Sequence, residues 1–231
     1  MPHKRIGILG GMSPESTVEY YRHITHRYTE RFGDHGYPEI VIYSVSFQPY
    51  IDWPEAGRWD RVAQGLGEAA RHLEAAGVDL ILIATNTMHI VFDQVQAQVD
   101  VPMVSLLDAV ADAIEAQGLE TVGLLGTTFT MEKPFYREAL AERGIDVLVP
   151  EPAGRETVNR IIYDELVAGK ITEASRAAFV AVVDRLAVRG AEGVILGCTE
   201  IPLLISEADV DLPLFDTTAI HAEAALNEAL G

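Results

Sequence analysis

The sequence predicts an α/β protein built from two similar lobes. Short apolar runs rich in β-branched residues alternate with longer amphipathic segments along the 231-residue chain. This alternation is typical of repeated strand–helix units around a parallel sheet. Two apolar motifs also recur later in the chain, in the same order and at nearly the same spacing. A duplicated α/β lobe accounts for both observations.

The predicted strands are the short apolar runs. They are Ile6–Leu9, Ile40–Val45, Leu80–Ala84, Met103–Leu106, Val122–Leu125, Val147–Val149, Val194–Leu196 and Leu214–Phe215. The predicted helices are the longer segments, whose apolar residues recur at helical spacing. They lie near Ser16–Phe32, Trp59–Ala76, Ile90–Ala97, Leu107–Gln117, Lys133–Arg143, Glu156–Ala168, Glu173–Arg189 and Ala219–Leu230. Strands that alternate with helices in this way favour parallel sheets with helices on their faces.

The repeated motifs mark the two lobes. RIGILGG at residues 5–11 recurs as TVGLLGT at 121–127, an offset of 116, and GVDLILIAT at 77–85 recurs as GAEGVILGC at 190–198, an offset of 113. We therefore expect two pseudo-symmetric Rossmann-like lobes, each a parallel sheet flanked by helices, at residues 1–104 and 105–208, with residues 209–231 returning to the first lobe. Parallel sheets bind ligands at the carboxyl ends of their strands, so the duplication predicts an active site in a cleft between the lobes.

Composition and charge exclude several classes of protein. The chain carries 17 Lys and Arg against 35 Asp and Glu, a net charge of −18. Such a surface repels phosphate backbones and anionic lipid, so neither a nucleic acid nor a membrane is an expected partner. Apolar stretches such as Ala177–Val183 are far shorter than the ~18 residues of a membrane span. The N-terminal apolar run stops at Ser13-Pro14-Glu15, which is too short and too acidic for a secretory signal, so we expect a cytoplasmic protein.

Cys198 is the first candidate for chemistry, and as the only cysteine it cannot form an internal disulfide. It follows a buried-strand pattern in GCTEIP (197–202), before an expected helical turn. A thiol at a helix N-terminus feels the positive end of the dipole and unpaired backbone amides, which lower its pKa toward the thiolate. The alternative is a buried inert thiol. The strand-end position and the polar Thr199-Glu200 that follow favour a base or nucleophile.

Thr85 occupies the position in the first lobe that Cys198 occupies in the second. Asn86, Thr87 and the amides that open the next helix offer donors suited to a carboxylate. A helix cap would explain one such residue, not three in succession. His89 either packs on the helix or orients a neighbour. With no second cysteine and no HExxH spacing, we expect no metal site.

The loop GGMSPE (10–15) lacks both GxGxxG and GxxxxGK[ST], so a nucleotide phosphate is not its expected ligand. The glycine pair after a strand is interpreted as a close approach of the backbone to a small ligand. Ser13 before Pro14 and Glu15 predicts a helix start.

Six motifs together resemble the aspartate/glutamate racemase family. They are GGMSPEST (10–17), TNTMH (85–89), GTTFTM (126–131), IIYDEL (161–166), GCTEIPLL (197–204) and FDTTAIHA (215–222). They span nearly the whole chain in the family's order. The resemblance implies two pseudo-symmetric α/β lobes with the active site between them, no pyridoxal phosphate or other cofactor, and a homodimer.

The family pattern places a cysteine at the end of the matching strand in each lobe, and the pair acts from opposite faces of the substrate Cα. Cys198 matches the second position, whereas Thr85 replaces the first cysteine, as in the L-aspartate/L-glutamate-specific subset. Racemisation without a cofactor needs one group to remove the Cα proton and another to return it from the far side. A thiolate can remove it, but a threonine hydroxyl is a poor base. We therefore expect Cys198 to act on the L-enantiomer, with strongly unequal rates in the two directions.

The resemblance also implies the substrate contacts. The groups that would hold the amino-acid carboxylates are Asn86, Thr87, Thr127 and Thr199, with amides near Met12 and Met88. Arg155 is the candidate for the distal carboxylate, and an arginine that some members carry after the second strand has no match in SFQPY (46–50). Glu200 either orients Cys198 or Thr199 or is a solvated residue at a helix start. Lys170 is expected to be an exposed cation at a helix end.

Two other functions remain open at this point. One is a single-cysteine decarboxylase or isomerase of a small dicarboxylate in the same superfamily, where only one face needs a proton donor. The other is a non-catalytic amino-acid binding module that has lost one catalytic residue.

Overall fold

The computed structural model describes residues 3–231, and the chain divides into two compact units. The first comprises the chain up to Ala109 together with Thr218–Gly231, and the second comprises Val110–Thr217. The C-terminal helix α10 (Thr217–Leu230) therefore packs as part of the first unit.

The first unit is built on a four-stranded parallel sheet in the order β2-β1-β3-β4. Its strands are β1 (Ile6–Gly10), β2 (Ile40–Ser44), β3 (Leu80–Ile83) and β4 (Met103–Val104). Leu9 pairs with Tyr43 on one side and with Ile83 on the other. The loops that follow β1, β2 and β3 therefore leave the sheet at one edge.

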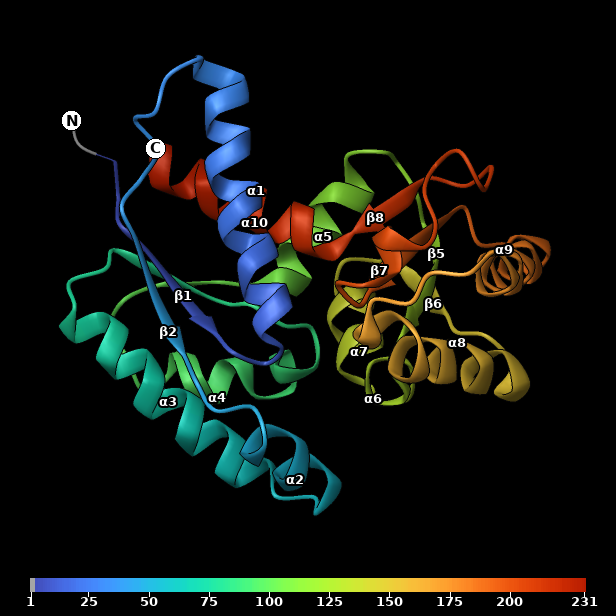
Figure 1. Cartoon of the computed structure of the whole chain (residues 1–231), viewed down its shortest axis with the longest axis horizontal. Coiled ribbons are helices and arrows are strands. Elements are labelled where there is room, and N and C mark those ends of the chain that lie inside the picture. The colour runs from blue at the N-terminus through green and yellow to red at the C-terminus, as the bar shows by residue number, and fades with distance from the viewer. Residues whose placement is uncertain (1–2) are drawn as a thin grey trace. The chain divides into compact units, whose positions relative to one another are not determined.

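Helices cover both faces of this sheet (Figure 1). Helices α1 (Pro14–Phe32) and α10 pack on the face that carries Ile6 and Ile8, whereas α3 (Trp59–Ala75) and α4 (Phe92–Gln96) pack on the face that carries Leu9. The alternation follows from the two-residue period of a strand. Both sides of β1 are buried, which is why its sequence is an unbroken apolar run.

The second unit repeats this arrangement. Its parallel sheet has the order β6-β5-β7-β8, formed by β5 (Thr121–Gly126), β6 (Asp146–Leu148), β7 (Gly193–Gly197) and β8 (Leu214–Asp216). Its helices are α5 (Leu106–Glu115), which begins in the first unit, α6 (Thr128–Glu132), α7 (Phe135–Ala141), α8 (Pro152–Asp164) and α9 (Glu173–Val188). Strands β1 and β3 correspond to β5 and β7, so the predicted duplication of an α/β lobe is confirmed.

Several helices differ from the prediction at prolines. The helix predicted over Lys133–Arg143 is α7, which begins only after Pro134. Helix α6, which precedes it, lies outside the predicted range and ends before Lys133, whose backbone is extended as favoured before a proline. Helix α2 (Pro49–Glu55) was not predicted, and Pro49 stands at its start. The predicted helix Ile90–Ala97 is a 3₁₀ turn, η1 (Thr87–Val91), followed by the short α4. Short 3₁₀ turns η2 (Leu166–Ala168) and η3 (Ile201–Leu203) follow α8 and β7.

Candidate active site

The candidate residues of the first unit begin with the glycine loop after β1. Ser13 caps α1, because its Oγ accepts the Ser16 backbone N–H at 3.3 Å, and Pro14 opens the helix as predicted. Gly11 has a φ of 95°, and a Cβ there would lie 2.4 Å from the Val45 carbonyl oxygen. Packing against the chain's own backbone therefore requires the glycine, and the close approach of a small ligand to this loop stays a prediction.

Thr85 lies just beyond the end of β3, partly buried. The preceding residue is held by α1, since Ser16 Oγ donates to the Ala84 carbonyl at 2.7 Å. Asn86 is buried, and Thr87 begins η1. These polar residues share one tight turn at the carboxyl edge of the sheet.

His89 is bonded to this turn. Its Nδ1 lies 2.9 Å from the Thr85 carbonyl oxygen, and its Nε2 accepts the Leu106 backbone N–H at 3.2 Å. The ring also stacks on Phe92 at a centroid distance of 5.4 Å. The two interpretations left open for His89, packing and orienting a neighbour, thus apply together.

The second unit carries its main candidate residues in the turn after β7. Cys198 follows Gly197 directly and is partly buried. Its Sγ donates to Glu200 Oε2 at 2.9 Å, and Thr199 Oγ1 donates to the same oxygen at 2.7 Å. Glu200 therefore contacts both of the residues that the sequence proposed for it.

The expected lowering of the Cys198 pKa is wrong. Burial raises the pKa of this thiol well above its usual value, and the Glu200 carboxylate raises it further, outweighing the backbone N–H groups of Thr199 and Glu200. The helix dipole cannot offset this, because the turn after Cys198 leads only into the three-residue η3. In this structure Cys198 is a protonated thiol whose proton points at a carboxylate.

Thr127 lies at the end of β5, where it caps α6. Its Oγ1 accepts the Thr130 backbone N–H at 3.4 Å. The next amide, that of Thr128, donates to Asn159 Oδ1 of α8 at 2.8 Å. Sequence reasoning missed Asn159, although it stands two positions before the IIYDEL motif.

Thr217 was also missed. Its buried Oγ1 donates to the Leu196 carbonyl at 2.9 Å and so holds β7 two residues before Cys198. The FDTTAIHA motif includes Thr217 and could have pointed to this residue.

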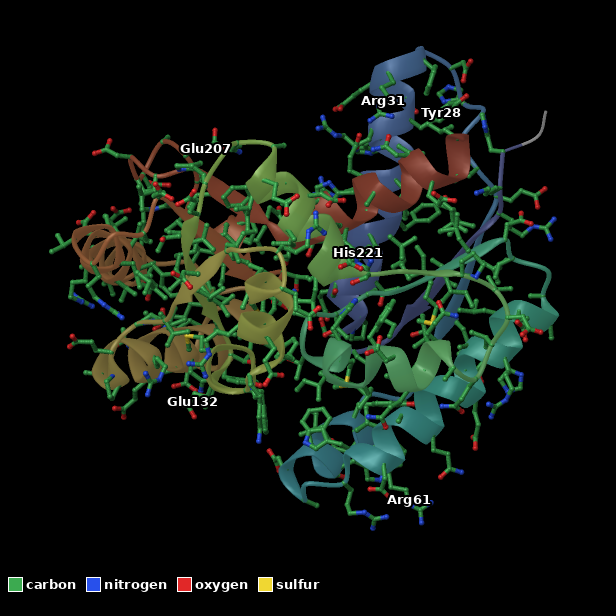
Figure 2. All side chains as sticks on the ribbon, turned by 180° about the vertical axis from the view of Figure 1, so that it is seen from behind. Tyr28, Arg31, Arg61, Glu132, Glu207 and His221 are labelled. Carbon is green, nitrogen blue, oxygen red and sulfur yellow. The ribbon has the colours of Figure 1, made fainter. Side chains whose placement is uncertain are left out.

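Arg155 is already paired within its own unit. Its Nε lies 3.1 Å from Glu132 Oε1, and its Nη1 donates to the Pro150 carbonyl at 2.9 Å. Glu132 is labelled in Figure 2. A ligand carboxylate would have to compete with Glu132 for this guanidinium.

Within residues 3–231, no three His, Cys, Asp or Glu side chains gather in a way that could hold a metal ion. No helix in that range has the length and apolar character needed to cross a bilayer.

Known proteins resemble the whole chain. Residues 9–225 match the family model described as Asp/Glu/Hydantoin racemase. The broad specificity amino-acid racemase RacX of Bacillus subtilis is 25% identical over 228 residues, which cover 97% of this chain and 98% of that protein.

Two solved structures are similar over nearly the full length. A Yersinia pestis protein provisionally assigned as an Asp/Glu racemase is 45% identical with a TM-score of 0.94, covering 99% of this chain and 100% of that one. An aspartate racemase homologue from Pyrococcus horikoshii OT3 is 43% identical with a TM-score of 0.87, covering 98% and 99%. The predicted fold class is confirmed by these likenesses.

Proposed function

The chain belongs to the Asp/Glu/hydantoin racemase family, and from that premise we propose that it is a cofactor-independent racemase that interconverts L- and D-aspartate or glutamate. The observation that carries the proposal is the matched position of two residues in a duplicated sheet. Thr85 follows β3 and Cys198 follows β7, the corresponding strand of the second unit. Racemisation needs two groups that act on opposite faces of one carbon, and duplication provides two equivalent positions.

In the proposed reaction Cys198 acts on the L-enantiomer. The thiol first gives its proton to Glu200 Oε2, to which it already donates. The thiolate then takes the Cα proton, and the C–H electron pair remains on the substrate as an enolate-like carbanion. Thr85 Oγ returns a proton to the opposite face and regains one from solvent, and Glu200 releases its proton to solvent, which restores the resting state. Because a threonine hydroxyl is a poor base, the reverse direction is the more difficult one.

The substrate carboxylates are proposed to bind the hydroxyl and amide donors at the strand ends. These donors are Asn86, Thr87, Thr127 and Thr199, with the backbone amides near Met12 and Met88. Donors concentrated there would also stabilise the carbanion. Arg155 is proposed to exchange Glu132 for the distal carboxylate, which would give that end of the substrate a charged partner.

Incubation with L-aspartate and with L-glutamate in deuterated water tests the proposal. We expect deuterium at Cα and the appearance of the D-enantiomer, and Cys198→Ser should abolish both. Release of carbon dioxide from a small dicarboxylate, with amino acids untouched, would instead identify the decarboxylase. Unchanged ligand affinity in Cys198→Ala, without turnover in either protein, would identify a binding module.

We also propose that the protein acts as a homodimer in the cytoplasm, where a lone thiol stays reduced. Strand β2 is an outer strand of its sheet, and its Ile42 and Tyr43 are 42% and 37% exposed. Residues 40–51 carry no charge, so a second copy could approach this edge without the repulsion expected of a chain of net charge −18. Light scattering should give twice 25.2 kDa for the wild type and 25.2 kDa for Ile42→Lys. A monomeric wild type would contradict the dimer.

A further inference from the structure

Two buried histidines lie side by side in the first unit. His89 comes from η1 and is 4% exposed, and His221 comes from α10 and is fully buried (labelled in Figure 2). Their ring centroids are 5.5 Å apart, with the planes at 74°. Histidines this far from solvent need a partner for each ring nitrogen.

The partners determine which nitrogen of each ring carries the proton. A carbonyl only accepts and a backbone N–H only donates, so His89 has its hydrogen on Nδ1, facing the Thr85 carbonyl, and a lone pair on Nε2, facing the Leu106 amide. His221 has the opposite tautomer. Its Nε2–H donates to the Val104 carbonyl at 2.8 Å, and its Nδ1 accepts the Tyr20 hydroxyl at 2.9 Å. Both rings are therefore neutral and fully bonded.

Both histidines bind the same short segment. Val104 and Leu106 flank Ser105, between the end of β4 and the start of α5, shortly before the chain leaves the first unit after Ala109. His221 holds the first of these residues and His89 the second. The opposite nitrogen of His89 holds the backbone of Thr85. A rigid ring thus fixes the distance between this segment and the backbone of the proposed proton donor.

We propose that His89 is a positioning residue that sets the place of Thr85, with His221 holding the segment against which His89 is braced. The inference rests on the proposed function, in which Thr85 delivers the proton that inverts the substrate. His89 does not touch the substrate in this role. Its loss should leave proton removal by Cys198 intact and impair only proton delivery by Thr85.

The partition of L-substrate in deuterated water separates these two steps. After Cys198 removes the proton, a deuteron returns either from the same side, giving labelled L-amino acid, or from Thr85, giving the D-enantiomer. The ratio of D-enantiomer to labelled L-amino acid therefore reports only on proton delivery by Thr85. It does not depend on the amount of folded enzyme, so a merely structural defect would not change it.

His89→Phe keeps the ring shape and removes both hydrogen bonds. We expect the ratio to fall by about 10²-fold, the effect of a misplacement of about 1 Å. His89→Asn can still donate to the Thr85 carbonyl and should restore most of the ratio. Phe92→Leu is the matched control, because it removes the ring stacked on His89 but none of the hydrogen bonds, and the ratio should stay at the wild-type value.

Three other results would overturn either the positioning role of His89 or the proposed function. A wild-type ratio in His89→Phe would overturn the positioning role while leaving the racemase proposal in place, and so would a loss in Phe92→Leu as large as that in His89→Phe. A wild type that neither labels nor inverts its substrate would overturn the proposed function and this inference together.

Discussion

The Sγ atom of Cys198 lies 2.9 Å from Oε2 of Glu200, so the candidate base donates its own proton to a neighbouring carboxylate. A thiol whose pKa is raised by burial and by this carboxylate is unreactive until the proton is passed on. Glu200 therefore holds the thiol in its protonated form and also provides the group that can accept its proton. This relationship leads to the first prediction.

Glu200→Gln keeps the shape of the side chain and removes its charge. Because the carboxylate raises the Cys198 pKa, this pKa should be lower in the variant, while burial still keeps it above the usual value. The pH dependence of alkylation by iodoacetamide measures this directly, since Cys198 is the only cysteine. Racemisation should nevertheless fall by about 10²-fold, because the proton acceptor is lost. An unchanged alkylation profile would contradict the contact between Cys198 and Glu200. Thr199→Val is the control, because it removes the other hydrogen bond to Glu200 and keeps the carboxylate that raises the Cys198 pKa.

Thr85→Cys replaces a poor base by a good one at the proposed second position. The initial rate from D- to L-substrate should rise relative to the opposite rate, with compensating changes in KM because the equilibrium constant is one. Initial rates with each pure enantiomer measure the ratio. If the ratio does not change, Thr85 does not act on the substrate.

Substitutions of Arg155 and of Glu132 should change the substrate KM in opposite directions. Arg155→Ala should raise KM by about tenfold or more, whereas Glu132→Gln should lower it several-fold by releasing the guanidinium. Arg143→Ala is the matched control, since Arg143 pairs with Asp112 and Glu115 elsewhere in the same unit. Equal KM values in all three variants would remove Arg155 from the site.

The buried histidines should make stability depend on pH. Burial lowers the pKa of His89 to about 4 and that of His221, beside it, to about 3. A lowered folded-state pKa means that this stability is complete above the unfolded pKa of about 6.5 and is lost as the pH falls toward 4 and 3. Between pH 6 and 5 the free energy of unfolding should fall by about 1 kcal/mol for each histidine. Urea denaturation measures the slope, and His89→Phe should roughly halve it; an unchanged slope would mean that His89 does not contribute.

Comparing the stability of Gly11→Ala with that of Gly33→Ala tests whether the glycine loop packs against Val45 as described. Both glycines have positive φ, 95° and 72°, but a Cβ on Gly11 would meet the Val45 backbone, whereas nothing lies within 4 Å of one on Gly33. Gly33→Ala should cost only the left-handed conformation, about 1 kcal/mol. Gly11→Ala should cost about 3 kcal/mol or more, because the Val45 backbone must also move. Equal melting temperatures would show that the loop is not packed as described.

Local features of the molecule could be predicted where neighbouring residues decide them. Ser13 and Pro14 predict the start of α1 because a helix cap involves only residues a few positions apart. The position of Cys198 after a buried strand follows from the apolar run before it. Pro134 likewise marks the start of α7, since the residue before a proline avoids the helical region.

The sequence by itself determined the duplicated α/β architecture and placed Thr85 and Cys198 at equivalent strand ends, because strand and helix periodicity are properties of short segments. Only the tertiary structure decided the raised pKa of Cys198, the pairing of Arg155 with Glu132 and the meeting of His89 with His221. Burial, charge proximity and ring contacts depend on which residues the folded chain brings together in space, and a local pattern carries no information about those distances.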